Sequence, residues 1–121
     1  AMGKEIYVND EQQIDMATAV SGSGPAYFYL FLECLVEAAA EIGLEREAAL
    51  ELALETMLGA GHLLQKSGKT PADLRRMVTS PGGTTAEALK QFEQGDLGGL
   101  VKKAVAAAYR RAKTLGDSIQ A

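Results

Sequence analysis

The chain has 121 residues and a formal net charge of −4, from 12 basic and 16 acidic side chains. This length suffices for one domain with a modest hydrophobic core of its own, and the charge pattern shows no basic stripe for nucleic acid or an anionic membrane. Tryptophan is absent and aromatic residues make up 6% of the chain, so alanine is the main apolar filler, which favours packed helices over a β-sandwich. The single cysteine, Cys34, excludes an internal disulfide and is typical of a reducing compartment, so we expect a soluble cytoplasmic protein.

The first nine residues differ in character from the rest of the chain. Ala1–Gly3 resemble a cloning remnant, and Lys4–Asn9 contain the only strand-like run, Ile6–Val8. One short strand cannot form a sheet alone, so this segment either pairs with something outside the chain or is a tail. Its polar residues do not resemble a secretory signal.

The first helix is expected to begin after Asp10, a suitable N-cap with Gln13 three residues later, and to run to about Val20. The sequence Ser21–Gly24 is expected to break this helix. Pro25 is then well suited to be the first residue of the next helix, because the first helical position needs no N–H.

The next helix, Ala26–Ile42, is apolar on nearly every face, and its charges, Glu33, Glu37 and Glu41, form one narrow stripe. These charges interrupt the run too often for a membrane span. So narrow a polar face predicts burial on most sides, either as a central helix wrapped by others or inside an oligomer. The glutamates lack the histidine partners of helical di-metal sites, so we expect no metal.

Caps and apolar periodicity predict further helices in the rest of the chain. Their expected ranges are Arg46–Lys66, Pro71–Met77, Thr85–Gln94 and a last helix opened by Asp96. The residues expected to face inward are Leu50, Leu54, Leu58, Leu64, Ala88, Leu89, Phe92, Leu97, Leu100, Val101, Ala104, Val105, Ala108 and Leu115. Gly43, Gly68 and Gly95 are expected to end helices, and Gly59 and Gly61 to permit close helix contact. The predicted fold is an all-α bundle of five to six helices.

The loop Ser80–Thr85 is the strongest candidate for a ligand site. It carries Ser80, Pro81, two adjacent glycines and two threonines directly before a predicted helix. Backbone N–H groups at a helix start, flanked by hydroxyls, can hold a small anion such as a carboxylate or a phosphate. The alternative is a glycine-rich turn with no ligand.

Three other features favour structural interpretations. Gly22-Ser23-Gly24 does not fit a dinucleotide-binding loop, because Tyr27 stands where the third glycine belongs and no strand–helix–strand unit surrounds it. His62 lies on a predicted helix with no assignable catalytic partner, and Cys34 lies in the apolar helix as a small hydrophobic residue. Tyr27, Tyr29 and Tyr109 are interpreted as packing residues with a polar tip.

Two long motifs resemble one known family, pyrroline-5-carboxylate reductase. Residues 71–85 read PADLRRMVTSPGGTT, followed by Ala88-Leu89 and Phe92-Glu93, and residues 19–27 read AVSGSGPAY. The similarity runs from about Lys4 to Gly116. The resemblance implies an oxidoreductase of proline biosynthesis that reduces 1-pyrroline-5-carboxylate to L-proline with NADPH or NADH.

The resemblance also implies which part of that enzyme this chain is. Members of the family have an N-terminal Rossmann domain for the cofactor and a C-terminal helical domain that interlocks as a homodimer, with further assembly possible. The chain is similar to the second domain alone, with residues 10–121 as the helical dimerisation and substrate-loop domain and residues 1–9 as a remnant of the missing one. Ile6–Val8 would then correspond to the last Rossmann strand.

Site residues follow from the resemblance, position by position. The loop residues Ser80, Gly82, Gly83, Thr84 and Thr85 would bind the substrate, with backbone N–H groups and the Ser80 hydroxyl on its carboxylate. The Thr85 hydroxyl would hydrogen-bond the ring nitrogen and is the expected catalytic residue.

For the cofactor, the resemblance places Gly24 and Pro25 near the nicotinamide, whereas Met77 stands at a position that is polar in some relatives. Without the Rossmann part, the fragment is expected to bind no cofactor and to be inactive. The alternative is a stand-alone helical dimerisation or interaction module without catalysis.

Overall fold

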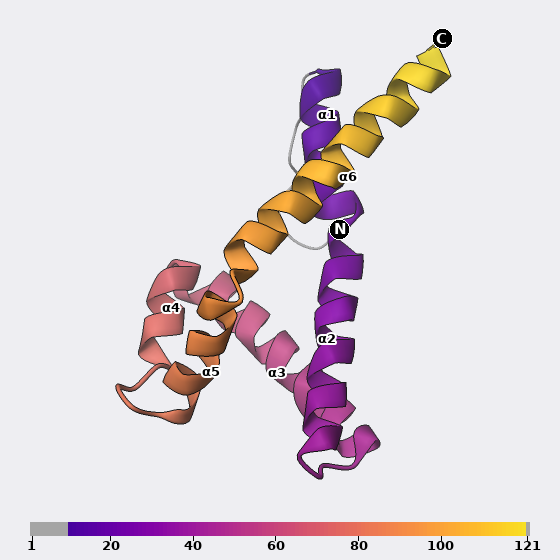
Figure 1. Cartoon of the computed structure of the whole chain (residues 1–121). Coiled ribbons are helices and arrows are strands. Elements are labelled where there is room, and N and C mark those ends of the chain that lie inside the picture. The colour runs from indigo at the N-terminus through magenta and orange to yellow at the C-terminus, as the bar shows by residue number, and fades with distance from the viewer. Residues whose placement is uncertain (1–9, 121) are drawn as a thin grey trace. The chain divides into compact units, whose positions relative to one another are not determined.

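The computed structural model describes residues 10–120 and, from 118 onward, only the backbone. The described part consists of helices α1 (Glu11–Ala17), η1 (Thr18–Gly22, a π-helical turn), α2 (Gly24–Glu41), α3 (Arg46–Ser67), α4 (Pro71–Met77), α5 (Thr84–Gln94) and α6 (Leu97–Gln120) (Figure 1). The predicted all-α class is confirmed. The strand-like Ile6–Val8 lies outside the described residues.

The chain divides into two compact units, which are described separately. The central unit is Tyr29–Leu97, and the flanking unit comprises the described residues before and after it. The central unit holds α3, α4, α5 and most of α2, so it contains the whole Ser80–Thr85 loop. The flanking unit holds α1, η1, the first residues of α2 and nearly all of α6.

The predicted N-cap at Asp10 is confirmed, because its Oδ1 accepts a hydrogen bond from the Gln13 N–H at 2.8 Å. The predicted break at Ser21–Gly24 is wrong. The chain instead continues through the π-helical turn and Ser23, whose φ of −85° and ψ of −25° are also helical, into α2. Pro25 is the second residue of α2 rather than the first. Small residues at 21–24 permit the wider turn, so they reshape the helix without ending it.

Several predicted helix ends are confirmed by their backbone geometry. Gly43 follows α2 with a φ of 109°, and Gly68 ends α3 in the left-handed conformation with a φ of 69°. Thr70 caps α4 by accepting the Asp73 N–H at 3.1 Å, and Pro71 follows as its first residue. These local signals therefore fix both ends of the α3–α4 connection.

The α5–α6 connection differs from its prediction in one detail. Gly95 follows α5 with a φ of −80°, and the left-handed residue is Asp96, with a φ of 54°. Aspartate tolerates this conformation better than most side chains because it is short and polar. The predicted end at Gln94 with Gly95 as the cap is confirmed, and only the left-handed conformation falls on the next residue.

The described residues do not form the expected hydrophobic core within a single chain. Among the described residues, the buried hydrophobic side chains are three alanines: Ala19, Ala49 and Ala53. The predicted inward residues Leu50, Leu54, Leu58, Leu64, Phe92, Leu97, Leu100, Val101 and Leu115 are all exposed. The prediction was wrong because periodicity marks the apolar face of a helix but not the molecule that covers it.

The nearly all-apolar α2 follows the same pattern. Phe28, Leu30, Phe31 and Leu35 are exposed, and Cys34 is exposed as well, so the described part of the chain does not cover these side chains. Of the two alternatives for this helix, burial in an oligomer is the one still open. A Cβ at Gly59 or Gly61 would meet no neighbouring element within 4 Å, so the described residues do not make the close helix contact expected there.

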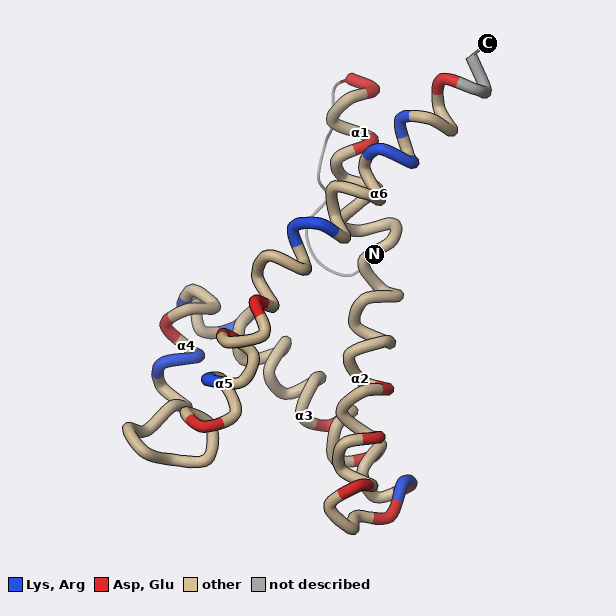
Figure 2. Tube along the Cα trace, viewed as in Figure 1, with Lys and Arg blue, Asp and Glu red and all other residues tan. Residues whose placement is uncertain are grey.

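Acidic residues gather at the end of α2 and the start of α3 (Figure 2). Glu37 of the predicted stripe pairs with Arg46, and both side chains are exposed. No described helix has the length and hydropathy to cross a membrane. The stripe therefore behaves as a solvated face of the central unit.

Candidate functional site

The candidate site is the connection between α4 and α5. It begins with Thr79, whose hydroxyl is already hydrogen-bonded to the backbone. The Thr79 hydroxyl donates to the Arg75 carbonyl at 2.6 Å, and the Thr79 N–H donates to the Arg76 carbonyl at 3.1 Å. Both bonds tie the start of the loop to the last turn of α4. Of the four hydroxyls in this region, that of Thr79 is thus structural.

Ser80–Gly83 form a β-turn. The Gly83 N–H donates to the Ser80 carbonyl at 3.0 Å, and Gly82, the third residue of the turn, has a φ of 72°. Proline in the second position and a positive φ in the third are the pattern of a type II turn, where only glycine fits without strain. The sequence Ser-Pro-Gly-Gly is rich in glycine, yet it adopts one defined turn geometry.

Gly83 is required for a different reason. It is the N-cap residue of α5 with a φ of −85° and a ψ of 178°, which any residue can adopt. However, a Cβ at this position would lie 3.2 Å from the Ser80 carbonyl oxygen and 3.5 Å from the Ser80 Cβ. A side chain at residue 83 would therefore open the turn.

The turn delivers the chain to a helix start that has no side-chain cap. The first helical bond of α5 runs from the Glu87 N–H to the Gly83 carbonyl at 3.2 Å, and no side chain accepts a hydrogen bond at the Gly83 cap. By helix geometry the N–H groups of Thr84 and Thr85 precede this bond and have no partner within the helix. With the positive end of the helix dipole, they form a position for an anion.

The five predicted substrate residues lie in the Ser80–Gly83 turn and at the first two positions of α5, and one of their backbone donors is already engaged. The Gly83 N–H, predicted to hold the carboxylate, donates to Ser80 instead. Of the predicted backbone donors, those of Thr84 and Thr85 are therefore the available ones. Ser80 and Thr84 are exposed and Thr85 is half-buried, so the two threonines differ in their access to solvent.

Two arginines precede the loop in the last turn of α4. Arg76 forms an ion pair with Asp73 at 3.0 Å, and Arg75 is exposed. Both positive charges interact favourably with the negative C-terminal end of the α4 dipole, and they add positive potential at the start of the loop. No carboxylate occurs between Arg75 and Ala86, so the loop has the electrostatic character of an anion site.

The predicted cofactor residues lie in the flanking unit. Gly24 is the one buried residue of α2 among those described, and Pro25 beside it is exposed. A Cβ on Gly24 would meet no atom within 4 Å, so there is room beside this backbone. Their immediate neighbour along the chain is the π-helical turn Thr18–Gly22.

Sequence reasoning missed one polar contact at this turn. The half-buried Tyr27 donates its hydroxyl to the Ala19 carbonyl at 2.8 Å, although tyrosine here was interpreted as packing. The available signal was Pro25, because a proline within a helix has no N–H for the carbonyl four residues earlier. That signal indicates an irregular turn but not which side chain stabilises it.

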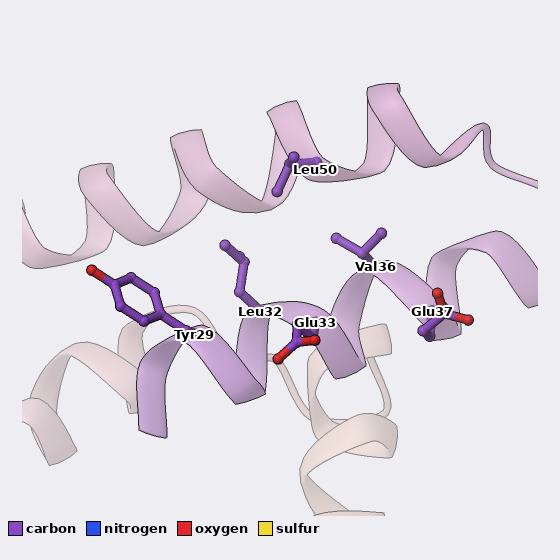
Figure 3. A pocket seen from close by; sticks show the side chains of 6 residues that line it. All are labelled: Tyr29, Leu32, Glu33, Val36, Glu37 and Leu50. Atoms are coloured by element: carbon purple, nitrogen blue, oxygen red, sulfur yellow. The ribbon is translucent and has the colours of Figure 1, made fainter. Parts of the chain in front are cut away.

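The central unit also carries two apolar grooves. The first, about 370 Å³, lies between α2 and α3, where Leu32 and Val36 point toward Leu50 while Glu33 points away (Figure 3). The second, about 660 Å³, is lined by residues of α3 and α4 that include Gly59, Leu63, Leu74 and Met77. Neither has converging polar groups, so both suit apolar side chains better than a polar ligand.

The comparisons with known proteins agree with the motifs. A family model described as pyrroline-5-carboxylate reductase dimerisation matches residues 11–115. The chain is 45% identical over 119 residues to pyrroline-5-carboxylate reductase from Pseudomonas aeruginosa, covering 98% of this chain and 44% of that protein. The protein of the same name from Arabidopsis thaliana is 44% identical over 118 residues, with 98% and 42% covered.

Solved structures of the same family match this chain over a similar share of their length. A pyrroline-5-carboxylate reductase from Coxiella burnetii superimposes with a TM-score of 0.88 at 47% identity, covering 91% of this chain and 41% of that one. The Plasmodium falciparum pyrroline carboxylate reductase, solved with NADP bound, has a TM-score of 0.86 at 40% identity, with 92% and 42% covered. The chain thus spans less than half the length of these relatives.

Proposed function

Because the chain belongs to the pyrroline-5-carboxylate reductase dimerisation family, we propose that it is the dimerisation and substrate-binding domain of such a reductase. The reaction is the reduction of 1-pyrroline-5-carboxylate to L-proline with NADPH or NADH, the last step of proline biosynthesis. The observation that carries the proposal is the uncapped start of α5 behind the Ser80–Gly83 turn, within a chain matched over residues 11–115. An exposed single cysteine is compatible with a cytoplasmic enzyme.

The substrate carboxylate is proposed to bind at the start of α5. The N–H groups of Thr84 and Thr85 supply two donors, and the exposed Ser80 hydroxyl supplies a third from the turn. Charge-assisted hydrogen bonds of this kind are stronger than neutral ones, and they fix the orientation of a planar carboxylate. The Gly83 N–H supports this arrangement indirectly by closing the turn onto Ser80.

The Thr85 hydroxyl is proposed to face the ring nitrogen of the substrate. A nicotinamide supplies the hydride when it is bound. The carbon of the protonated ring imine accepts that hydride while the nitrogen keeps its proton, so the residues here need only orient the ring. A neutral hydroxyl beside the nitrogen is sufficient for this, which agrees with a loop that contains no acid or base.

Gly24 and Pro25 are proposed to lie beside the nicotinamide in the complete enzyme. Gly24 has no side chain to keep a flat ring from its backbone, and neither residue carries a polar side chain that would compete for it. The sequence contains no glycine-rich strand–turn–helix unit for the rest of the dinucleotide. The dinucleotide would therefore be held mainly by residues beyond this chain.

A homodimer is proposed as the folded form. Exposed large apolar side chains occur on every described helix, for example Phe28 of α2 at 65% exposed, Leu58 of α3 at 62% and Leu100 of α6 at 62%. The three alanines that are buried between residues 10 and 117 cannot supply a core for this length of chain, and exposed apolar faces of this extent are typical of an obligate interface. A second copy that interlocks through these helices would bury them.

The proposal is tested with a chimeric enzyme in which this chain replaces the matching part of the Pseudomonas aeruginosa reductase. The two sequences are 45% identical over 119 aligned residues. We expect the chimera to oxidise NADPH or NADH in the presence of 1-pyrroline-5-carboxylate and to form proline. The chain alone should form none. A dimeric chimera without activity would contradict the proposal and favour a stand-alone interaction module.

A further inference from the structure

The π-helical turn changes which carbonyl each N–H meets. The Ser23 N–H donates to the Thr18 carbonyl at 2.8 Å, five residues earlier, whereas an α-helix would pair it with Ala19. The Ala19 carbonyl therefore loses the partner it would have in a regular helix. Ala19 is buried, so an unpaired carbonyl there would be costly.

Tyr27 supplies the replacement. Its hydroxyl donates to the Ala19 carbonyl at 2.8 Å across eight residues. In a straight α-helix, residues eight positions apart are separated by about 12 Å along the axis, more than two helical turns. A contact between residues 19 and 27 is therefore not part of the regular helix pattern. The hydrogen bond thus joins the π-helical turn to α2 and depends on the wider geometry between them.

Pro25 explains why the turn occurs here. Pro25 has no N–H for the Ser21 carbonyl, and in a regular helix its ring would clash with that carbonyl. The Ala26 N–H instead donates to the Ser23 carbonyl at 3.1 Å. The Ser21 hydroxyl donates to the Ala17 carbonyl at 2.9 Å, so the turn is held by side chains from within and by Tyr27 from α2.

The turn sets the orientation of the residues that follow it. One extra residue in a helix rotates everything after it by about 100° relative to a regular helix. Gly24 and Pro25 come directly after the turn, so the face that they present depends on it. We propose that Tyr27 is a positioning residue, whose hydroxyl holds the π-helical turn and so places Gly24 and Pro25 against the nicotinamide ring.

This inference rests on the proposed function, because the turn matters for catalysis only if those two residues meet the cofactor. The test is Tyr27→Phe in the chimeric enzyme, which removes the hydroxyl and keeps the ring. We expect the KM for NADPH or NADH to rise about three- to tenfold, as for the loss of one hydrogen bond. The KM for 1-pyrroline-5-carboxylate should change by less than about twofold, because the substrate loop belongs to the central unit.

The matched control is Tyr109→Phe. Tyr109 is also half-buried in the flanking unit, where its ring contacts the Lys113 ammonium at 5.7 Å and the substitution retains that ring. Both KM values should stay unchanged in this variant. A KM does not depend on the fraction of enzyme that is folded, so a merely destabilised Tyr27→Phe variant would lower the apparent kcat and leave the KM values alone.

Hydrogen exchange gives a second readout on the 121-residue chain itself. In Tyr27→Phe, the amides of Gly22–Gly24 should exchange about three- to tenfold faster, and those of α3 should not change. An active chimera in which Tyr27→Phe leaves the cofactor KM unchanged overturns the positioning role and leaves the proposed function standing. An inactive parent chimera overturns the proposed function and the positioning role with it.

Discussion

At the scale of single residues, the loop separates hydroxyls that hold the backbone from hydroxyls that can meet a ligand. The Thr79 hydroxyl is bonded to the Arg75 carbonyl, whereas the half-buried Thr85 lies in the first turn of α5 beside the candidate anion position. Sequence alone cannot make this distinction, because all these residues are small and polar. Their different roles come from the direction of the chain at the end of α4.

Thr85→Val tests the role of the Thr85 hydroxyl in the chimeric enzyme. Valine keeps the shape of the side chain and removes the hydroxyl proposed to lie beside the reacting nitrogen, so we expect kcat to fall about 10- to 100-fold. Thr85→Ser, which retains the hydroxyl, should recover most of the rate. Thr114→Val is the control, because the Thr114 hydroxyl donates only to the Arg110 carbonyl on α6. An unchanged kcat in Thr85→Val would remove this hydroxyl from the mechanism.

At the scale of elements, the α4–α5 connection depends on a glycine that lacks a positive φ. The Cβ of an alanine at residue 83 would press against the Ser80 carbonyl oxygen at 3.2 Å, which a turn closed by that same carbonyl cannot easily relieve. In the chimera, Gly83→Ala should therefore raise the KM for 1-pyrroline-5-carboxylate about tenfold, by moving Ser80 away from the start of α5. Steady-state kinetics would measure this change.

Gly116→Ala provides the matched control for that prediction. A Cβ at Gly116, on α6, would meet no atom within 4 Å, and alanine is the better helix former. Its KM values should equal those of the parent chimera. If Gly83→Ala behaved in the same way, the turn would not position the substrate.

The elements also show what the sequence could predict and what it could not. The caps at Asp10, Thr70 and Gly68 were predictable, because each depends on residues within four positions. The π-helical turn was not, since Ser21–Gly24 looks like a helix break until the Tyr27 hydroxyl is seen to reach back to Ala19. Local composition indicated an irregularity there. The hydrogen bond between Tyr27 and Ala19, eight residues apart, accounts for its form as a π-helical turn.

At the scale of the whole molecule, the missing core is the main difference between sequence and structure. The helices, their order and the loop residues followed from pattern and resemblance, yet leucines such as Leu58 and Leu100 remain exposed in the single chain. Amphipathicity specifies a face and leaves its partner open. The expectation that the 121 residues bury a modest core of their own was wrong, whereas burial inside an oligomer, the other alternative predicted for α2, stays open.

The proposed dimer can be tested directly by sedimentation velocity of the chain at micromolar concentration. We expect twice the mass of one chain, and Leu100→Glu should shift the population to monomer or to unfolded chain, because a charge in a buried apolar interface is costly. Gln91→Glu adds the same single charge at an exposed position of α5 and should remain dimeric. A monomeric, folded parent chain would contradict the proposed assembly.

The central claim is that the start of α5 holds the carboxylate of a cyclic imino acid, and it is tested most directly by a crystal structure of the chimeric enzyme with its product, L-proline. We expect the proline carboxylate oxygens about 3 Å from the backbone nitrogens of Thr84 and Thr85, with the Thr85 hydroxyl facing the ring nitrogen. Proline bound elsewhere in an active enzyme, with the Ser80–Thr85 loop making no contact to it, would contradict this assignment.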